Sequence, residues 1–165
     1  MGILSEDMKR VVRQQRLGFI ATVCPDGTPN LSPKGTAAVW DDDHLVFADL
    51  ASPVTMANLA HNPALEINVV DAFSRKGYRF KGTGAIIACG KLFDELKDAY
   101  ATGSQCVQKI GISPKAFVMV TVTKAAELVS PAYTPGVEEA TIRQQWAAHW
   151  ASVHETQMRQ SSGGN

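Results

Sequence analysis

The chain has 165 residues, a length that fits one domain with a hydrophobic core. Its 16 basic and 16 acidic residues balance to a formal net charge of zero, which argues against a general electrostatic footprint for nucleic acid. No apolar run approaches the roughly 18–20 residues of a membrane span, and we see no secretory signal at the start. The three cysteines are scattered and form no CxxC pair, which fits a reducing cytoplasm better than a disulfide framework. These features predict a cytoplasmic protein that binds neither a membrane nor nucleic acid.

The first part of the chain predicts one helix followed by strands. Residues 6–16 have an apolar stripe at helical spacing, with Ser5 placed to cap the helix. Pro25-Asp26-Gly27-Thr28 is a strong turn signal, and the three aspartates at 41–43 are typical of a charged hairpin loop. We expect these turns to separate three strands that form an antiparallel meander, at residues 19–24, 30–40 and 44–48.

The second part predicts further helices and strands. Ser52-Pro53 opens a helix, because serine is a good N-cap and proline suits the first helical position; His61-Asn62-Pro63 ends it. Gly82-Thr83-Gly84 marks a bend within a long strand, as barrel corners often need. Alternation and helical spacing predict the remaining elements: strands at 65–70, 78–87 and 117–122 reaching toward 127–129, and helices at 91–101 and 138–157.

This order of elements predicts an α+β protein, mainly β, with six antiparallel strands in a barrel and flanking helices. The strands do not alternate with helices as strict βαβ units, which disfavours a parallel sheet. We expect residues 1–157 to form a single domain, with helices within 1–16 and at 138–157. The serine- and glycine-rich end, within 158–165, predicts a disordered tail.

Three features have the chemistry to hold a ligand, and each also has an ordinary structural explanation. The helix start offers free N–H groups and the hydroxyls of Ser52 and Thr55, which favour phosphate, although most capped helices bind nothing. Lys34 lies beside a proline and a glycine, where a flat ligand can approach the backbone, but an edge lysine also prevents aggregation. Residues 75–81 contain four cations, with Arg79 facing away from the aromatic side, yet a solvated strand face is the commoner explanation for such a run.

Other candidates favour structural roles. His149 and His154 are spaced wrongly for two ligands on one helix face, and no cluster completes a metal site, so we assign no metal. The chain contains no GxSxG, Walker A or GxGxxG motif, and its catalytic residues stay unassigned. Trp146 and Trp150 are one helical turn apart and predict packing in a core or at a dimer interface.

Several short segments share the order and spacing found in one known family. They are residues 18–23, 26–29, 32–35, 45–49, 52–55 with 58–59, and 75–82. Together they resemble the pyridoxamine 5′-phosphate oxidase-like FMN-binding split-barrel family, over about residues 18–88 and more loosely to 129. The resemblance implies a split β-barrel, FMN as the cofactor and a homodimer.

The same resemblance implies where FMN is held. The second strand lies along the flavin ring, the end of the third strand and the next helix start hold ring and phosphate, and the partner's fifth strand reaches the flavin. Residues 53–55 lack the basic pair that many members have there, so the helix dipole, Lys34 or a cation within 75–79 must meet the phosphate. The implied cofactor-binding residues are Ser32, Pro33, Lys34, Gly35, Thr36, Asp49, Ser52, Thr55, Arg75, Lys76, Gly77, Tyr78 and Arg79, with Arg79 our choice for the contact across the interface.

The resemblance implies an FMN-dependent oxidoreductase acting on an unknown small molecule, with the flavin supplying the redox chemistry. It is not expected to be a true pyridoxamine phosphate oxidase, because the arginine–histidine pair beside a C-terminal tryptophan is absent. Two alternatives stay open: a flavin protein for electron transfer or storage, and a flavin-free barrel that binds nucleic acid or a partner through residues 75–81. Relatives of this fold also use haem or a deazaflavin, so both remain alternative ligands.

Overall fold

The computed structural model describes residues 2–104 and 107–162 of the chain. These residues form four helices and seven strands, which agrees with the predicted α+β class. In chain order the elements are α1 (Glu6–Gln15), β1 (Gly18–Val23), β2 (Pro29–Lys34), β3 (Ala38–Val39), β4 (His44–Asp49), α2 (Pro53–His61), β5 (Ala64–Asp71), β6 (Lys76–Ile87), α3 (Lys91–Thr102), β7 (Ala116–Val129) and α4 (Glu139–Ser162).

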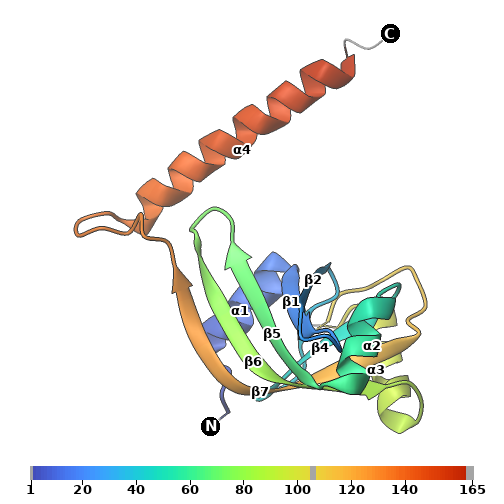
Figure 1. Cartoon of the computed structure of the whole chain (residues 1–165). Helices are drawn as coiled ribbons and strands as arrows, with labels where there is room; N and C mark the ends of the chain where they lie inside the picture. Colours follow the sequence, from blue (N-terminus) through green and yellow to red (C-terminus); the bar gives the residue numbers. More distant parts are fainter. Residues whose placement is uncertain (1, 105–106, 163–165) are drawn as a thin grey trace.

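The strands form one antiparallel sheet that curls into a split barrel (Figure 1). Its strand order is β2-β1-β5-β6-β7-β4-β3, so β2 and β3 lie at opposite edges. Only residues 35–37 link these two strands in the chain, which brings the two edges of the sheet close together. The predicted antiparallel split barrel is confirmed, with seven strands in place of six.

The extra strand arises because the predicted strand at 30–40 is interrupted, and this part of the prediction is wrong. The hydroxyl of Thr36 accepts a hydrogen bond from the Ala48 N–H at 3.1 Å and lies 3.2 Å from the Ala48 carbonyl oxygen, so a side chain replaces strand pairing there. β3 then pairs with β4, while β2 pairs with β1. The predicted meander therefore holds only in its two separate pairs: β2 and β3 lie at opposite edges of the sheet, and the second neighbour of β4 is β7.

The core and its glycine bend follow the sequence pattern closely. Ile20, Phe47 and Phe80 are fully buried inside the curled sheet, where each contributes roughly 1.5–3 kcal/mol of burial free energy. The pairing of β6 with β7 shifts register between Lys81 and Gly82, which confirms the predicted bend. A Cβ atom at Gly82 would collide with the carbonyl oxygen of Thr121, so the close strand approach requires glycine.

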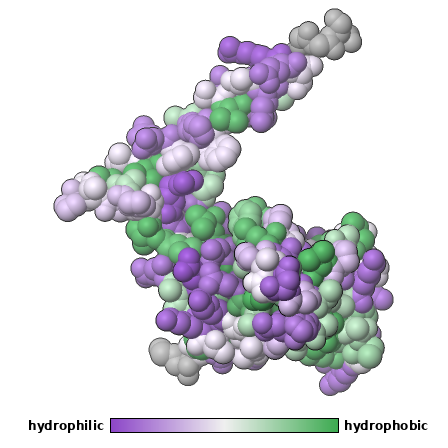
Figure 2. Space-filling model, in the orientation of Figure 1, coloured by the Kyte–Doolittle hydropathy of each residue, from purple (hydrophilic) through white to green (hydrophobic). Residues whose placement is uncertain are grey.

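Helix α4 projects from the barrel as an arm (Figure 1). Ile142 in its second turn is buried, whereas Trp150 is exposed, so of its two predicted placements the core is wrong and the dimer interface stays a prediction. The helix continues to Ser162, beyond the predicted end at 157, and the last three residues of the predicted tail lie outside the described residues. Figure 2 shows the arm standing away from the body, with hydrophilic and hydrophobic groups mixed along it. Among residues 2–104 and 107–162, no helix is both long and apolar enough to cross a bilayer.

Candidate functional site

A buried lysine lies where β2 approaches the start of α2. Lys34 is only 6% exposed, and its Nζ donates hydrogen bonds to the hydroxyls of Ser32, at 2.5 Å, and Ser52, at 2.7 Å. Burial lowers the pKa of Lys34, and the negative charge of Asp49 opposes this effect only in part. The ammonium group therefore has neutral hydroxyl partners, which leaves a positive centre that favours a bound anion.

The N-terminus of α2 lies beside this lysine. Asp49 accepts a hydrogen bond from the Ser52 N–H at 2.9 Å, while the Ser52 hydroxyl accepts from Lys34 and does not cap the helix. Among the described residues, no hydrogen-bond acceptor meets the N–H groups of Val54 and Thr55. Free N–H groups and the positive end of the helix dipole favour a negatively charged group at this point.

Thr55 differs from its expected placement, because the whole residue is only 2% exposed. Its hydroxyl is therefore buried, and we keep its backbone N–H as the candidate for anion binding because that group has no acceptor among the described residues. The neighbouring Val54 is 54% exposed and marks the open surface of this helix start. The burial of Thr55 depends on how α2 packs against β1, which a local cap signal does not report.

The other predicted residues of the second strand have mixed placements. Pro33 is exposed and pairs with Phe19 on β1, whereas Thr36 is buried and bonded to Ala48. The carbonyl oxygen of Gly35 accepts a hydrogen bond from the Gln108 side chain. The structure thus places Pro33 and Gly35 on the surface and buries Thr36. It brings together four predicted residues: Ser32, Lys34, Asp49 and Ser52.

Residues Arg75–Arg79 lie elsewhere, at the start of β6, three positions from β2 in the sheet order. The Arg75 guanidinium lies 4.3 Å from the centre of the Trp146 ring, and Gly77 packs tightly against the backbone of Val69. Among the described residues of one chain, no hydrogen bond or ion pair therefore joins Lys34 to Arg75–Arg79, the segment for which the resemblance implies flavin contacts.

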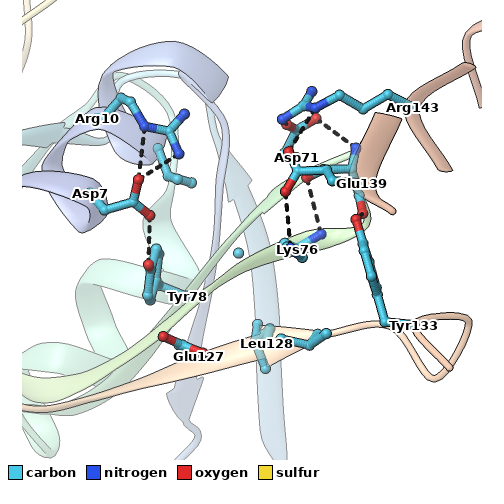
Figure 3. Close-up of a pocket in the computed structure, with 14 residues that line it drawn as sticks. Asp7, Arg10, Asp71, Lys76, Tyr78, Glu127, Leu128, Tyr133, Glu139 and Arg143 are labelled. Atoms are coloured by element: carbon cyan, nitrogen blue, oxygen red, sulfur yellow. Dashed lines mark hydrogen bonds and ion pairs between the residues drawn. The ribbon is translucent and has the colours of Figure 1, made fainter. Parts of the chain in front are cut away.

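Lys76 and Tyr78 line a pocket of about 420 Å³ between α1, β6, the end of β7 and the start of α4 (Figure 3). The Tyr78 hydroxyl donates to Asp7 at 2.6 Å, and this bond together with burial raises the pKa of Tyr78 to about 12. Lys76 pairs with Glu139 at 2.9 Å. The hydrogen bond from Lys76, and to a smaller extent that from Arg143, holds the pKa of Glu139 below its ordinary value. These pairs fasten α4 to the barrel and leave much of the charge in this pocket neutralised.

Arg79 lies on the opposite face of β6, as the predicted alternation requires. Its Nε donates to a carboxylate oxygen of Glu66 at 2.8 Å. The strand registers place Phe19, Asn68 and Arg79 in one row across this outward face. Among the described residues, nothing satisfies the buried Oδ1 of Asn68. Alternation along β5 indicates that Asn68 faces outward, and this signal was available in the sequence, although no role for Asn68 was predicted.

Asn58 is a second residue that sequence reasoning missed as a contributor to the site. It is buried, and its side-chain amide donates to the Thr22 hydroxyl at 3.0 Å. Asn30 donates to the same hydroxyl at 3.2 Å. These bonds tie α2 to β1 and β2, and so position the helix start against the strand that contains Lys34. The signal was its position one helical turn after Thr55, on the buried face of α2.

Comparison with known proteins places these features in a family. The family model described as "Pyridoxamine 5'-phosphate oxidase" matches residues 4–128, which leaves α4 outside the match. A crystal structure of tagged HupZ from Group A Streptococcus has 32% sequence identity and a TM-score of 0.67, covering 76% of this chain and 94% of that one. No curated protein gives a match.

Two further structures share the fold at lower identity. An FMN-binding protein from Syntrophomonas wolfei is 16% identical, with a TM-score of 0.63, over 77% of this chain and 87% of that chain. A protein named F420 reductase is 22% identical, with a TM-score of 0.55, over 74% of this chain and 98% of that chain. At these identities the likeness shows the fold alone.

Proposed function

We propose that this chain, which belongs to the pyridoxamine 5′-phosphate oxidase family, binds FMN as a homodimer and acts as an FMN-dependent oxidoreductase on a small molecule. The family match covers residues 4–128 and so includes both the buried lysine and the strand that carries Arg79. The family includes flavin-dependent oxidoreductases and, within the fold, an FMN-binding protein.

The observation that best supports this proposal is the buried Lys34 beside the open start of α2. FMN combines an anionic phosphate with a flat ring, and the structure offers a cation, two serine hydroxyls and free N–H groups in one place. We assign the phosphate to Lys34, Ser52 and the N–H groups of Val54 and Thr55. When bound, FMN supplies hydride or electron transfer, which side chains do not provide. The chain's own residues bind it, orient it and exclude water.

A second copy of the chain completes the site in this proposal. The outward face of the sheet exposes apolar side chains, among them Phe19, Val70 and Leu31, which is 64% exposed. A flat ring on a small barrel needs a second surface to shield it, and a two-fold dimer provides two equal sites from one contact. Arg79 lies on this face and is our candidate for the residue that reaches the partner's flavin.

The phosphate placement can be tested at Val54. A Val54→Glu substitution puts negative charge beside the proposed phosphate, and the helix N-terminus itself tolerates an acidic residue. We expect FMN affinity to fall at least tenfold, a loss of about 1.4 kcal/mol, in a fluorescence titration. Val54→Gln is the matched neutral control and should bind nearly as wild type. Equal affinity for the two variants would contradict the placement. Thr55 is unsuitable for this test, because a buried glutamate there would unfold the chain.

The shared site predicts complementation between two defective proteins. We expect neither Val54→Glu nor Arg79→Ala to bind FMN well alone. After random subunit exchange, half of the dimers are mixed and each contains one intact site, so binding recovers to about a quarter of capacity. No recovery despite demonstrated exchange, or a monomer by light scattering, would contradict the shared site.

A further inference from the structure

A second pocket, of about 370 Å³, opens where the C-terminal ends of α1 and α3 meet β3. Three basic residues line it: Arg13 and Arg16 at the end of α1, and Lys109 from the segment after α3. The pocket shares no lining residue with the cluster around Lys34. Its apolar floor consists of the buried residues Val12, Ala37, Ala38 and Val107.

The charge of this pocket is unbalanced. No carboxylate lines it, and none of its three cations forms an ion pair with any residue in 2–104 or 107–162. Two helix C-termini each contribute about −0.5 charge, so the local total is still close to +2. The pocket beside Tyr78 provides an internal contrast, because four carboxylates and three cations line it together.

Cations at a helix C-terminus are common, and the dipole of α1 alone would explain Arg13 and Arg16. It does not explain Lys109, which comes from a different segment and lines the same cavity. The neighbouring Gln108 donates a hydrogen bond to the Gly35 carbonyl and so attaches this segment to the link between β2 and β3. The three charges are therefore brought together by the fold and not by one helix.

We propose that this pocket binds the phosphate group of a small molecule, at a site separate from that of FMN. A phosphate concentrates nearly two charges and several acceptor oxygens on one centre, so three cations from different directions can engage it at once. A carboxylate has one charge and two oxygens and matches three cations less well. The apolar floor leaves room for the uncharged part of the molecule.

The test is a calorimetric titration of the FMN-loaded protein with inorganic pyrophosphate at low ionic strength. We expect wild type to bind pyrophosphate at least tenfold more tightly than citrate. The double variant Arg13→Gln/Arg16→Gln should bind pyrophosphate at least tenfold more weakly than wild type. Lys109→Gln should weaken pyrophosphate binding by a smaller factor. Lys91→Gln removes an exposed lysine of α3 outside the pocket and is the charge-matched control for Lys109→Gln.

Three results would overturn the proposal. They are absence of pyrophosphate binding by wild type, equal affinity for citrate, and an equal loss in the Lys91→Gln control. A fourth result would also overturn it. If the double variant loses FMN affinity by the same factor as pyrophosphate affinity, the pocket is part of the flavin site and not separate. Unchanged FMN affinity in the double variant supports separation, whatever the outcome at Val54.

Discussion

Two lysines of this chain are almost completely buried, and their surroundings differ in kind. Lys9 on α1 is 7% exposed and contacts two carboxylates, Glu6 at 2.7 Å and Asp42 at 2.5 Å. The hydrogen bond to Asp42, and to a smaller extent that to Glu6, raises the pKa of Lys9. Within the described part of the chain, Lys34 donates hydrogen bonds only to serine hydroxyls, and its burial lowers its pKa.

Under the proposed function, this difference separates a structural charge from one that awaits the cofactor. Carboxylates of the same chain neutralise the charge of Lys9, and its ion pair with Asp42 links α1 to the loop before β4. A buried cation with neutral partners reduces stability until an anion arrives, and such a cost is typical of functional sites. The first three of the predictions that follow test whether the two lysines differ in this way, and the fourth tests a residue that the proposal leaves outside the cofactor site.

The largest expected effect is on FMN affinity. Lys34→Met removes a charge-assisted hydrogen bond worth about 1.5–3 kcal/mol, so the Kd for FMN should rise roughly 10- to 100-fold. The unfolding midpoint of the FMN-free protein should stay the same or rise, because a buried charge is replaced by an apolar chain of similar length. Fluorescence titration and thermal unfolding measure the two quantities. A loss of stability without a loss of affinity would assign Lys34 a structural role.

Lys9→Met should give the opposite result. It leaves Glu6 and Asp42 without their shared cation, so the thermal midpoint should fall by about 3 °C. FMN affinity should match wild type, because Lys9 contacts none of the residues assigned to the cofactor. A weaker affinity for FMN in this variant would show that the two lysines are not separable.

A smaller effect is expected in the pH dependence of stability. Since the pKa of Lys34 is lowered in the folded chain from its ordinary value of 10.5, its burial cost applies at neutral pH. That cost disappears as pH rises through the folded pKa toward 10.5. The stability advantage of Lys34→Met over wild type should therefore shrink across this window in urea unfolding. The contribution of Lys9 to the pH dependence has the opposite sign. Its stabilising effect is complete below pH 10.5 and is lost as the pH rises above that value.

The smallest effect concerns Tyr78, in a pocket where most charges are paired. Tyrosinate absorbance should include one group that titrates at about pH 12, and Tyr78→Phe should remove it. FMN affinity should change less than twofold, since Asp7 and not the cofactor holds this hydroxyl. If Tyr78→Phe leaves the titration curve unaltered, the bond to Asp7 does not control its ionisation.

Local patterns predicted much of the fold, because alternation and caps act over a few residues. The outward direction of Arg79, the helix that begins at Pro53 and the bend at Gly82 all follow from such patterns. The break after β2 was not predictable, since it depends on a bond between Thr36 and the distant Ala48.

Four residues of the candidate site were named from the sequence, but their surroundings were not predictable. Sequence reasoning singled out Lys34 and Ser52, yet an edge lysine and a buried one look identical in a local window. The burial of Lys34 requires two sheet edges and α2 to meet, which is a property of the closed fold. The cavity formed by Arg16 and Lys109 depends in the same way on segments far apart in the chain.

NMR of ¹³Cε-labelled lysine can follow the ionisation of Lys34 itself and so test whether this lysine binds the cofactor. The Lys34→Met variant assigns the signal, and Lys9 serves as the internal reference. Without FMN, the pKa of Lys34 should lie below 10.5. Saturating FMN should raise it, because an anion stabilises the charged form, while Lys9 stays unchanged. A Lys34 pKa that is the same with and without bound FMN would contradict the claim that this lysine is held ready for the cofactor.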